Sequence, residues 1–149
     1  AKPLSDYPVL VANNSAPGAQ RAGVAMQGNV LIVDNDLNIT ASLEFLLRHI
    51  GFNCLVADSY ASAIDNVSGQ QLDAALIDSN LPDRSGYSLC QKLLSTPGFE
   101  HLPILMLTTQ VLQAEQEKAL SLGAMDFIMK PFNPLLVTQR IQDLLTKAA

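Results

Sequence analysis

The sequence predicts an α/β fold in which a five-stranded parallel sheet is doubly wound, with helices on both faces. From Asn29 onward, five short apolar runs alternate with five longer segments of helical period. The apolar runs, such as Val-Leu-Ile-Val at residues 30–33, are continuous, which is typical of strands buried on both faces. The chain has 149 residues, of which 48% are hydrophobic and 15% charged. One domain with a sizeable core is therefore expected.

Cap and turn residues divide the strands from the helices. Gly51 and Gly123 are expected to end the first and fourth helices, and Ser59 is expected to begin the second as its N-cap. Leu37 opens the apolar helical pattern of the first helix. The expected strands are residues 30–33, 53–57, 74–77, 103–107 and 125–129, and the expected helices are residues 37–50, 60–69, 87–95, 111–122 and 134–147.

Residues 1–27 differ from the rest of the chain. They contain three prolines and a cluster of Asn, Ser, Gly and Ala residues, which is typical of a linker or an N-terminal tail. The short apolar piece at residues 7–12 is either a stray strand or the remnant of a preceding domain. The sequence therefore predicts a tail at 1–27 and one globular domain at 28–149.

Charge and cysteine content exclude several classes of protein. The formal net charge of -5 argues against non-specific binding of this domain to nucleic acid or to an anionic membrane. No apolar run approaches the ~20 residues of a membrane span, and the first residues lack the layout of a signal peptide. Cys54 and Cys90 match no metal spacing and are too few for a disulfide framework. We expect a cytoplasmic domain with two reduced, buried thiols.

Polar residues with complementary chemistry follow the expected strands. Asp34 follows the first strand, Asp78 the third, Thr108 the fourth and Lys130 the fifth. In parallel sheets ligands bind beyond the carboxyl ends of the strands. Carboxylates that lie close together repel unless a cation neutralises them, and Mg²⁺ prefers such oxygen ligands. The set suits phosphoryl transfer onto a carboxylate, with lysine and threonine holding phosphoryl oxygens.

Each of these residues also has an ordinary structural interpretation. A single aspartate after a strand is most often a helix N-cap or a turn former, which is the role expected for Asp58. Thr108 alone would be an N-cap, and Lys130 alone a solvated surface charge. Their joint occurrence at one edge of the sheet is what favours a functional site.

Four segments together resemble the receiver domain of two-component response regulators, in the CheY-like superfamily. They are VLIVDND (30–36), ALIDSNLPDRSG (75–86), LPILMLTT (102–109) and GAMDFIMKPF (123–132). The resemblance covers about residues 29–147. It implies a flavodoxin-like (βα)₅ fold with strand order 2-1-3-4-5. It also implies a signalling switch in a phosphorelay rather than an enzyme, in which Asp78 accepts a phosphoryl group from a histidine kinase or a histidine phosphotransfer protein.

The resemblance further assigns roles around Asp78. Asp34 falls at an acidic metal position, and Asn80 falls where the family offers a backbone carbonyl to Mg²⁺. Thr108 and Lys130 match the hydroxyl and the lysine that hold the phosphoryl group, and Phe127 matches an aromatic residue that changes rotamer with the hydroxyl. An output domain or partner protein would then read the face formed by the fourth helix, fifth strand and fifth helix.

One position departs from the family pattern. The family usually has two adjacent acids after the first strand, whereas here Asn35 holds the second position. An amide oxygen is a weaker Mg²⁺ ligand because one negative charge is lost. Asp36 is expected to cap the first helix instead of replacing that ligand. Two alternatives stay open: a degenerate receiver that works as a phosphorylation-independent docking module, and a haloacid dehalogenase-like phosphatase that uses Asp34 as nucleophile and Asp36 as acid/base.

Overall fold

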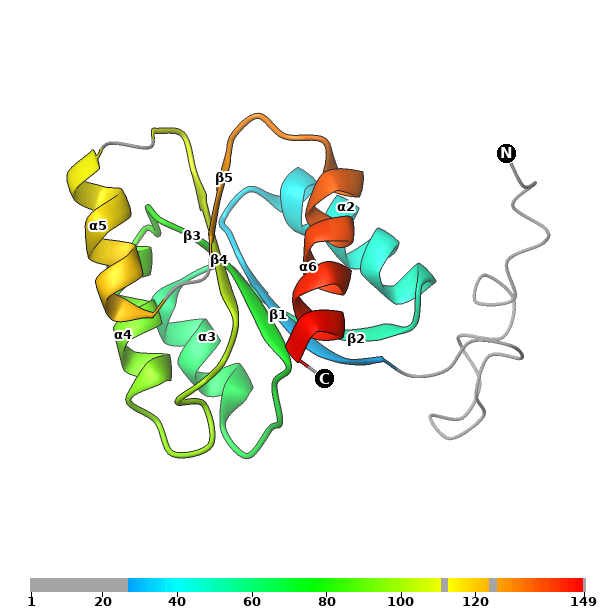
Figure 1. The fold of residues 1–149 in the computed structure, drawn as a ribbon, viewed down its shortest axis with the longest axis horizontal. Coiled ribbons are helices and arrows are strands. Elements are labelled where there is room, and N and C mark those ends of the chain that lie inside the picture. The colour runs from blue at the N-terminus through cyan, green and yellow to red at the C-terminus, as the bar shows by residue number, and fades with distance from the viewer. Residues whose placement is uncertain (1–26, 111–112, 124–125, 149) are drawn as a thin grey trace.

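The computed structural model describes residues 27–110, 113–123 and 126–148. Five parallel strands form one sheet in the order β2-β1-β3-β4-β5, as the resemblance implied (Figure 1). The strands are β1 (Gly28–Val33), β2 (Phe52–Ala57), β3 (Ala74–Asp78), β4 (Ile104–Thr108) and β5 (Asp126–Met129). The helices are α2 (Leu37–His49), α3 (Tyr60–Val67), α4 (Gly86–Leu94), α5 (Gln113–Leu122) and α6 (Pro134–Ala148).

The predicted elements are all present, with shifts of one or a few residues at their ends. Strands β3 and β4 run one residue further than expected and end on Asp78 and Thr108, because these residues still pair with Leu107 and Met129. The expected tail at 1–27 lies almost entirely outside the described residues. The apolar piece at 7–12, the start of the fourth helix at 111–112 and Met125 lie outside them as well.

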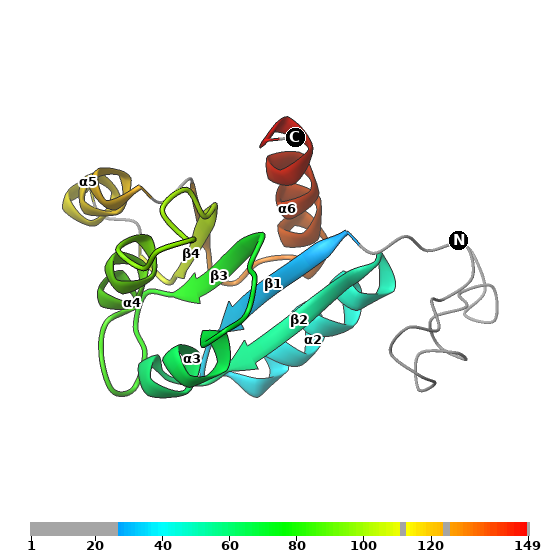
Figure 2. The same ribbon diagram turned by 90° about the horizontal axis from the view of Figure 1, so that it is seen from below.

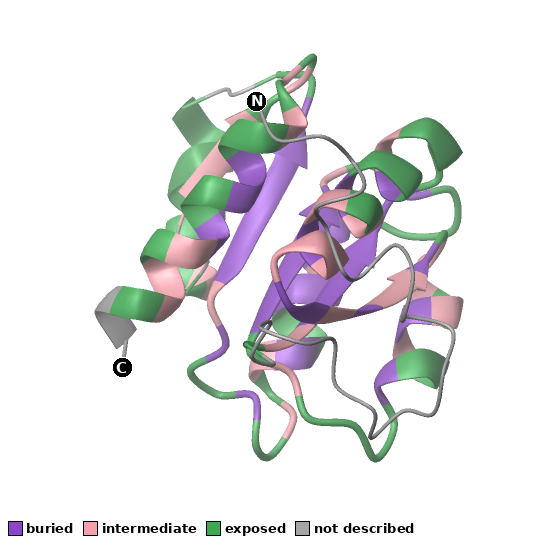
Figure 3. Cartoon of the chain, turned by 90° about the vertical axis from the view of Figure 1, so that its right-hand side faces the viewer, coloured by how far each residue is buried: buried purple, intermediate pink, exposed green. Residues whose placement is uncertain are grey.

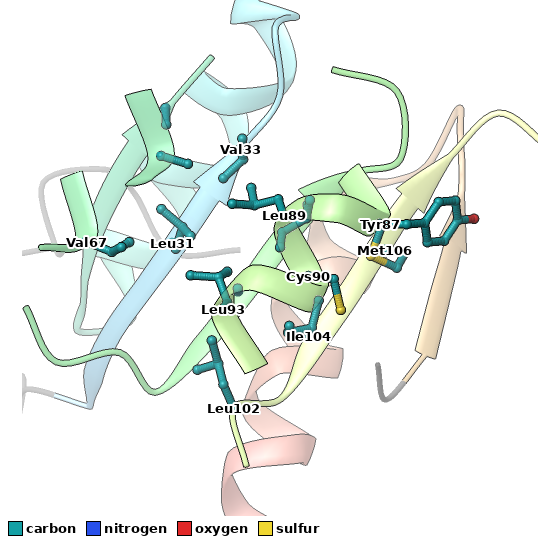
Figure 4. Packing of buried hydrophobic residues seen from close by; sticks show 14 of the residues in the cluster. Leu31, Val33, Val67, Tyr87, Leu89, Cys90, Leu93, Leu102, Ile104 and Met106 are labelled. Carbon is teal, nitrogen blue, oxygen red and sulfur yellow. The ribbon is translucent and has the colours of Figure 1, made fainter. Parts of the chain in front are cut away.

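Helices cover both faces of the sheet, so two cores form. Helices α3, α4 and α5 pack on one face and α2 and α6 on the other (Figures 1 and 2). The central strands β3 and β4 are buried throughout and β1 over its last four residues, as the purple strands in Figure 3 illustrate. Figure 4 shows part of the core beneath α4. Leu31, Val33 and Ile77 contribute to this core, while Val30, Ile32 and Leu76 contribute to the other. Alternate residues of each strand thus point to opposite cores, as two-sided burial requires.

The first turn of α2 corrects one expectation. Leu37 is 72% exposed and lies outside both cores, whereas Leu43 and Leu47 are fully buried. Helix α2 begins with Asp36 as its N-cap, whose carboxylate accepts hydrogen bonds from the backbone N–H groups of Asn38 and Ile39. Asp36 therefore has the structural role expected for it.

The N-cap of α3 corrects the expectation for Asp58. Ser59, as expected, is the N-cap, and it forms a reciprocal capping box with Ser62. Asp58, for which a capping role was expected, instead accepts a hydrogen bond of 3.1 Å from the Ser62 hydroxyl. Ser59 rather than Asp58 is the cap because the Ser59 hydroxyl accepts the backbone N–H of Ser62, at 3.1 Å.

Both cysteines are buried and free. Burial raises the pKa of the Cys54 thiol to about 12 and that of Cys90 to about 11, so both stay protonated at neutral pH. Within the residues that the structure describes, no helix has the length and apolar character needed to cross a membrane.

Candidate functional site

The four polar residues predicted at the strand ends lie together at the carboxyl edge of the sheet. The loops after β1, β4 and β5 lie along the upper edge in Figure 1. Backbone hydrogen bonds extend the sheet to the site: the Asp34 N–H donates to the Ala57 carbonyl at 3.1 Å, and the Lys130 N–H donates to the Thr108 carbonyl at 2.7 Å. The site residues are therefore attached to rigid strand ends.

Lys130 lies between the two buried aspartates. Its Nζ is 2.7 Å from Asp34 Oδ2 and 3.5 Å from Asp78 Oδ2. Asp34 is 0% exposed and Asp78 is 6% exposed. Each aspartate also accepts a backbone hydrogen bond, from the Asp36 N–H at 2.9 Å and from the Asn80 N–H at 3.1 Å respectively. Two carboxylates against one ammonium leave a buried negative charge, which favours binding of a further cation.

The pKa of Asp78 is raised above the ordinary aspartate value. Burial is the largest cause, and the nearby Asp34 carboxylate adds to it. The Asn80 N–H and the Lys130 ammonium act in the opposite direction. Perturbation of a carboxyl group in this way, next to a lysine, is typical of functional sites.

Thr108 lies at the end of β4 and is 2% exposed. Its hydroxyl group takes part in three hydrogen bonds. Thr108 Oγ1 donates to the Gln110 carbonyl at 2.9 Å and accepts from the Gln110 N–H at 3.3 Å. It also accepts a hydrogen bond of 2.9 Å from Ser79 Oγ. Sequence analysis gave Ser79 no role, although its place directly after Asp78 put it at the right edge of the sheet.

Gly86 is a second residue whose role sequence analysis missed. A Cβ atom at Gly86 would lie 1.9 Å from the backbone carbonyl oxygen of Asp78, so only glycine fits here. The Gly86 N–H donates to the Ser79 carbonyl at 2.9 Å. The first residue of α4 is therefore held directly against the backbone at the end of β3.

The loop between β3 and α4 is also fastened to α3. The Asp83 carboxylate accepts hydrogen bonds from the N–H groups of Tyr60 and Ala61 at 2.9 and 3.0 Å. These bonds, Ala61 first, hold the pKa of Asp83 below its usual value. The Arg84 guanidinium lies 4.4 Å from the centre of the Tyr60 ring. The loop that follows Asn80 is thereby anchored on α3.

The residues available to a metal ion are Asp34, Asp78, the carbonyl of Asn80 and the amide of Asn35. No cluster of three or more His, Cys, Asp or Glu residues suited to a metal occurs in the described part of the chain. Asn35, at the position where a second adjacent acid was expected from the family pattern, is exposed. Two carboxylates with water and phosphate oxygens still match the ligands that Mg²⁺ takes. Asp36, the acid/base of the phosphatase hypothesis, caps α2, which is a structural role.

Phe127 and Thr108 lie on the same side of the sheet. Phe127 pairs with Met106 on β4, and Met106 precedes Thr108 by two residues, so all three side chains point to one face. Phe127 is half-buried against the core formed with α3, α4 and α5. A pocket of about 420 Å³ adjoins Thr108 on this side and is lined by residues that include Ser79, Tyr87, Gln110, Glu115 and Lys118. Space for rearrangement therefore adjoins the hydroxyl.

Comparison with known proteins gives one consistent family. The family model described as the response regulator receiver domain matches residues 30–142. The transcriptional regulatory protein GltR of Pseudomonas aeruginosa is 34% identical over 120 residues, which cover 80% of this chain and 50% of GltR. The chain spans about half the length of the curated relatives it matches.

Solved structures agree with this match. A putative response regulator from Chloroflexus aurantiacus is 34% identical, with a TM-score of 0.72 over 80% of this chain and 98% of that chain. The BeF₃-activated receiver domain of DrrB, from Thermotoga maritima, is 25% identical, with a TM-score of 0.73 over 81% of this chain and 99% of that chain.

Proposed function

The chain belongs to the response regulator receiver domain family, and we propose that it accepts a phosphoryl group on Asp78 from a histidine kinase or a histidine phosphotransfer protein. One observation carries the proposal: Asp78 is buried at the end of β3, with Lys130 Nζ 3.5 Å from its carboxylate and Thr108 at the end of the neighbouring strand. This arrangement provides an acceptor, a cation and a hydroxyl at one edge of a rigid sheet.

The residues divide the transfer step between them. An Asp78 carboxylate oxygen forms a bond to phosphorus while the phosphorus–nitrogen bond of the donor phosphohistidine breaks, and the leaving imidazole takes up a proton. Lys130 holds a phosphoryl oxygen by its positive charge, and the Thr108 hydroxyl donates a hydrogen bond to another. Burial excludes water from the acceptor, which strengthens both interactions.

Asp34, Asp78, the Asn80 carbonyl and, more weakly, Asn35 would hold Mg²⁺. Bound there, the metal neutralises the oxygens of the transferring group. Asp34 Oδ2 lies 2.7 Å from Lys130 Nζ, so a metal held by Asp34 would share this carboxylate with the lysine. The loss of one acid at Asn35 lowers the affinity without removing the site.

The phosphoryl group would act as a switch. It adds about two negative charges at the carboxyl edge, towards which Thr108 moves, and Phe127 repacks on the same face of the sheet. The readout is the face formed by α5, β5 and α6, where Leu120 and Met129 are 55% and 52% exposed. An output domain or a partner protein would contact this face, and the domain at 28–149 would act in the cytoplasm without binding nucleic acid itself.

Intact-mass measurement tests the proposal. Incubation of the chain with acetyl phosphate and Mg²⁺ is expected to add one phosphoryl unit that alkali removes. Asp78→Asn is expected to gain none, whereas the matched variant Asp73→Asn, at the other edge of the sheet, gains one as wild type does. No gain in wild type would favour the docking module, and an unchanged gain in Asp78→Asn would move the acceptor to Asp34.

A further inference from the structure

Ser79 follows Asp78 directly, and its side chain reaches the neighbouring strand. Ser79 Oγ donates a hydrogen bond of 2.9 Å to Thr108 Oγ1. The Ser79 backbone is fixed on both sides, because its N–H donates to the Leu107 carbonyl and its carbonyl accepts from the Gly86 N–H, each at 2.9 Å. The hydroxyl is therefore presented to Thr108 from a rigid support.

This contact completes the hydrogen bonding of Thr108. A threonine hydroxyl has one proton and two lone pairs. The proton goes to the Gln110 carbonyl, while the lone pairs accept from the Gln110 N–H and from Ser79 Oγ. Thr108 thus has no proton free for a phosphoryl oxygen. It can donate to a phosphorylated Asp78 only after it leaves these partners.

We infer that Ser79 is a positioning residue that holds Thr108 in its resting rotamer and so opposes formation of the activated state. The inference rests on the proposed function of Asp78 and Thr108. Ser79 is only half-buried, so its hydroxyl can turn to water once Thr108 has moved. A neutral hydrogen bond of this kind shifts an equilibrium constant by roughly twofold to tenfold. Ser79 therefore weakens binding of a phosphoryl analogue by about this factor.

Titration with beryllium fluoride and Mg²⁺ tests the inference in the 149-residue chain. Threonine methyl groups carry ¹³C, and the Thr108 methyl resonance reports binding. Ser79→Ala is expected to bind the analogue roughly twofold to tenfold more tightly than wild type. Without the analogue, its Thr108 resonance is expected to lie closer to the bound position, because more of the protein already has Thr108 released.

Three further variants isolate the hydrogen bond. Ser79→Thr keeps a hydroxyl and is expected to bind with wild-type affinity. Ser95→Ala makes the same deletion at an exposed serine that caps the end of α4, and it is expected to change nothing. In a Thr108→Val background, binding is followed at the remaining labelled threonine methyl groups, such as that of Thr109. Ser79→Ala is expected to have no effect there, because there is no hydroxyl left to hold.

Unchanged or weaker binding in Ser79→Ala would overturn the role of Ser79, and so would an effect that persists in Thr108→Val. Failure of the proposed function gives a different result. Asp78→Asn would then bind the analogue as tightly as wild type, or no variant would bind it, and the role of Ser79 would fall with the acceptor.

Discussion

The aspartates at the two edges of the sheet differ in their surroundings. At the amino edge, Asp73 is exposed and its carboxylate accepts a hydrogen bond of 2.8 Å from the Asn29 N–H. At the carboxyl edge, Asp34 and Asp78 are buried beside Lys130. Asp73 is further joined to β1 through its own N–H, which donates to the Asn29 carbonyl at 2.8 Å. Because Asp73 is exposed, solvent screens its charge. Its hydrogen bonds hold the start of β3 next to β1.

The carboxyl edge differs because burial removes the water that would stabilise its charges. Two carboxylates there have one close ammonium, so the negative charge is incompletely balanced. Such an edge is less favourable for folding and more favourable for a cation or for phosphoryl chemistry. Burial and neighbouring charges, rather than position at a strand end alone, therefore distinguish the two buried aspartates from Asp73.

Gly86→Ala is expected to have the largest effect at the carboxyl edge. Its Cβ would lie 1.9 Å from the Asp78 carbonyl oxygen, which is backbone and cannot turn aside. Overpacking of this kind costs up to about 3 kcal/mol, and displacement of the loop should also abolish phosphorylation of Asp78. Urea unfolding and intact-mass measurement would show both losses.

Gly69→Ala is the matched control, because it strains the backbone but places the new Cβ against no other atom. Gly69 has φ +73°, yet nothing lies within 4 Å of an added Cβ. Its cost should therefore be only the conformational one, about 1 kcal/mol, with normal phosphorylation. Equal losses of stability in the two variants, or a phosphorylated Gly86→Ala, would contradict the close packing of α4 on Asp78.

An added negative charge at Asn35 is expected to increase the difference in cation binding between the two edges. Asn35→Asp restores an acidic ligand beside Asp34 and is expected to tighten Mg²⁺ binding by roughly tenfold, about 1.4 kcal/mol. Phosphorylation at limiting Mg²⁺ should rise with it and converge with wild type at saturation. Asn38→Asp is the control, since it places the same charge at an exposed position in the first turn of α2. Equal affinity in wild type and Asn35→Asp would show that the metal is not held at this position.

The sheet and most of the site could be predicted because both depend on short-range patterns. Continuous apolar runs such as residues 30–33 specify buried strands, and the residue after each run falls at the carboxyl edge. Asp34, Asp78, Thr108 and Lys130 were all predicted in this way.

The parts that could not be predicted depend on side-chain direction and contact between elements. Leu37 fits the helical period but lies in the first turn of α2, outside both cores, and is exposed. The bond from Ser79 to Thr108 and the approach of Gly86 to Asp78 depend on how β3 is placed relative to β4 and α4. The boundary between the tail at 1–27 and the domain at 28–149 stays a prediction, and so does the role of Asn35 in metal binding.

The two edges are finally expected to differ in the sign of their effect on stability. Because burial raises the pKa of Asp78, its ionisation opposes folding: the folded protein holds the proton more tightly than the unfolded chain does. Stability is therefore lost as pH rises above the ordinary aspartate pKa of about 3.9 through the higher value in the folded state. In chelator at pH 7, Asp78→Asn should unfold at a higher urea concentration than wild type, while Lys130 keeps its closer partner Asp34 at 2.7 Å. The advantage should vanish below about pH 4, where Asp78 is protonated in both states.

Asp73→Ala should instead lower the stability by about 1 kcal/mol, because a hydrogen bond that holds two strands is lost. Urea unfolding between pH 3 and 7 checks both, and destabilisation of Asp78→Asn at pH 7 would show that Asp78, like Asp73, is a structural residue.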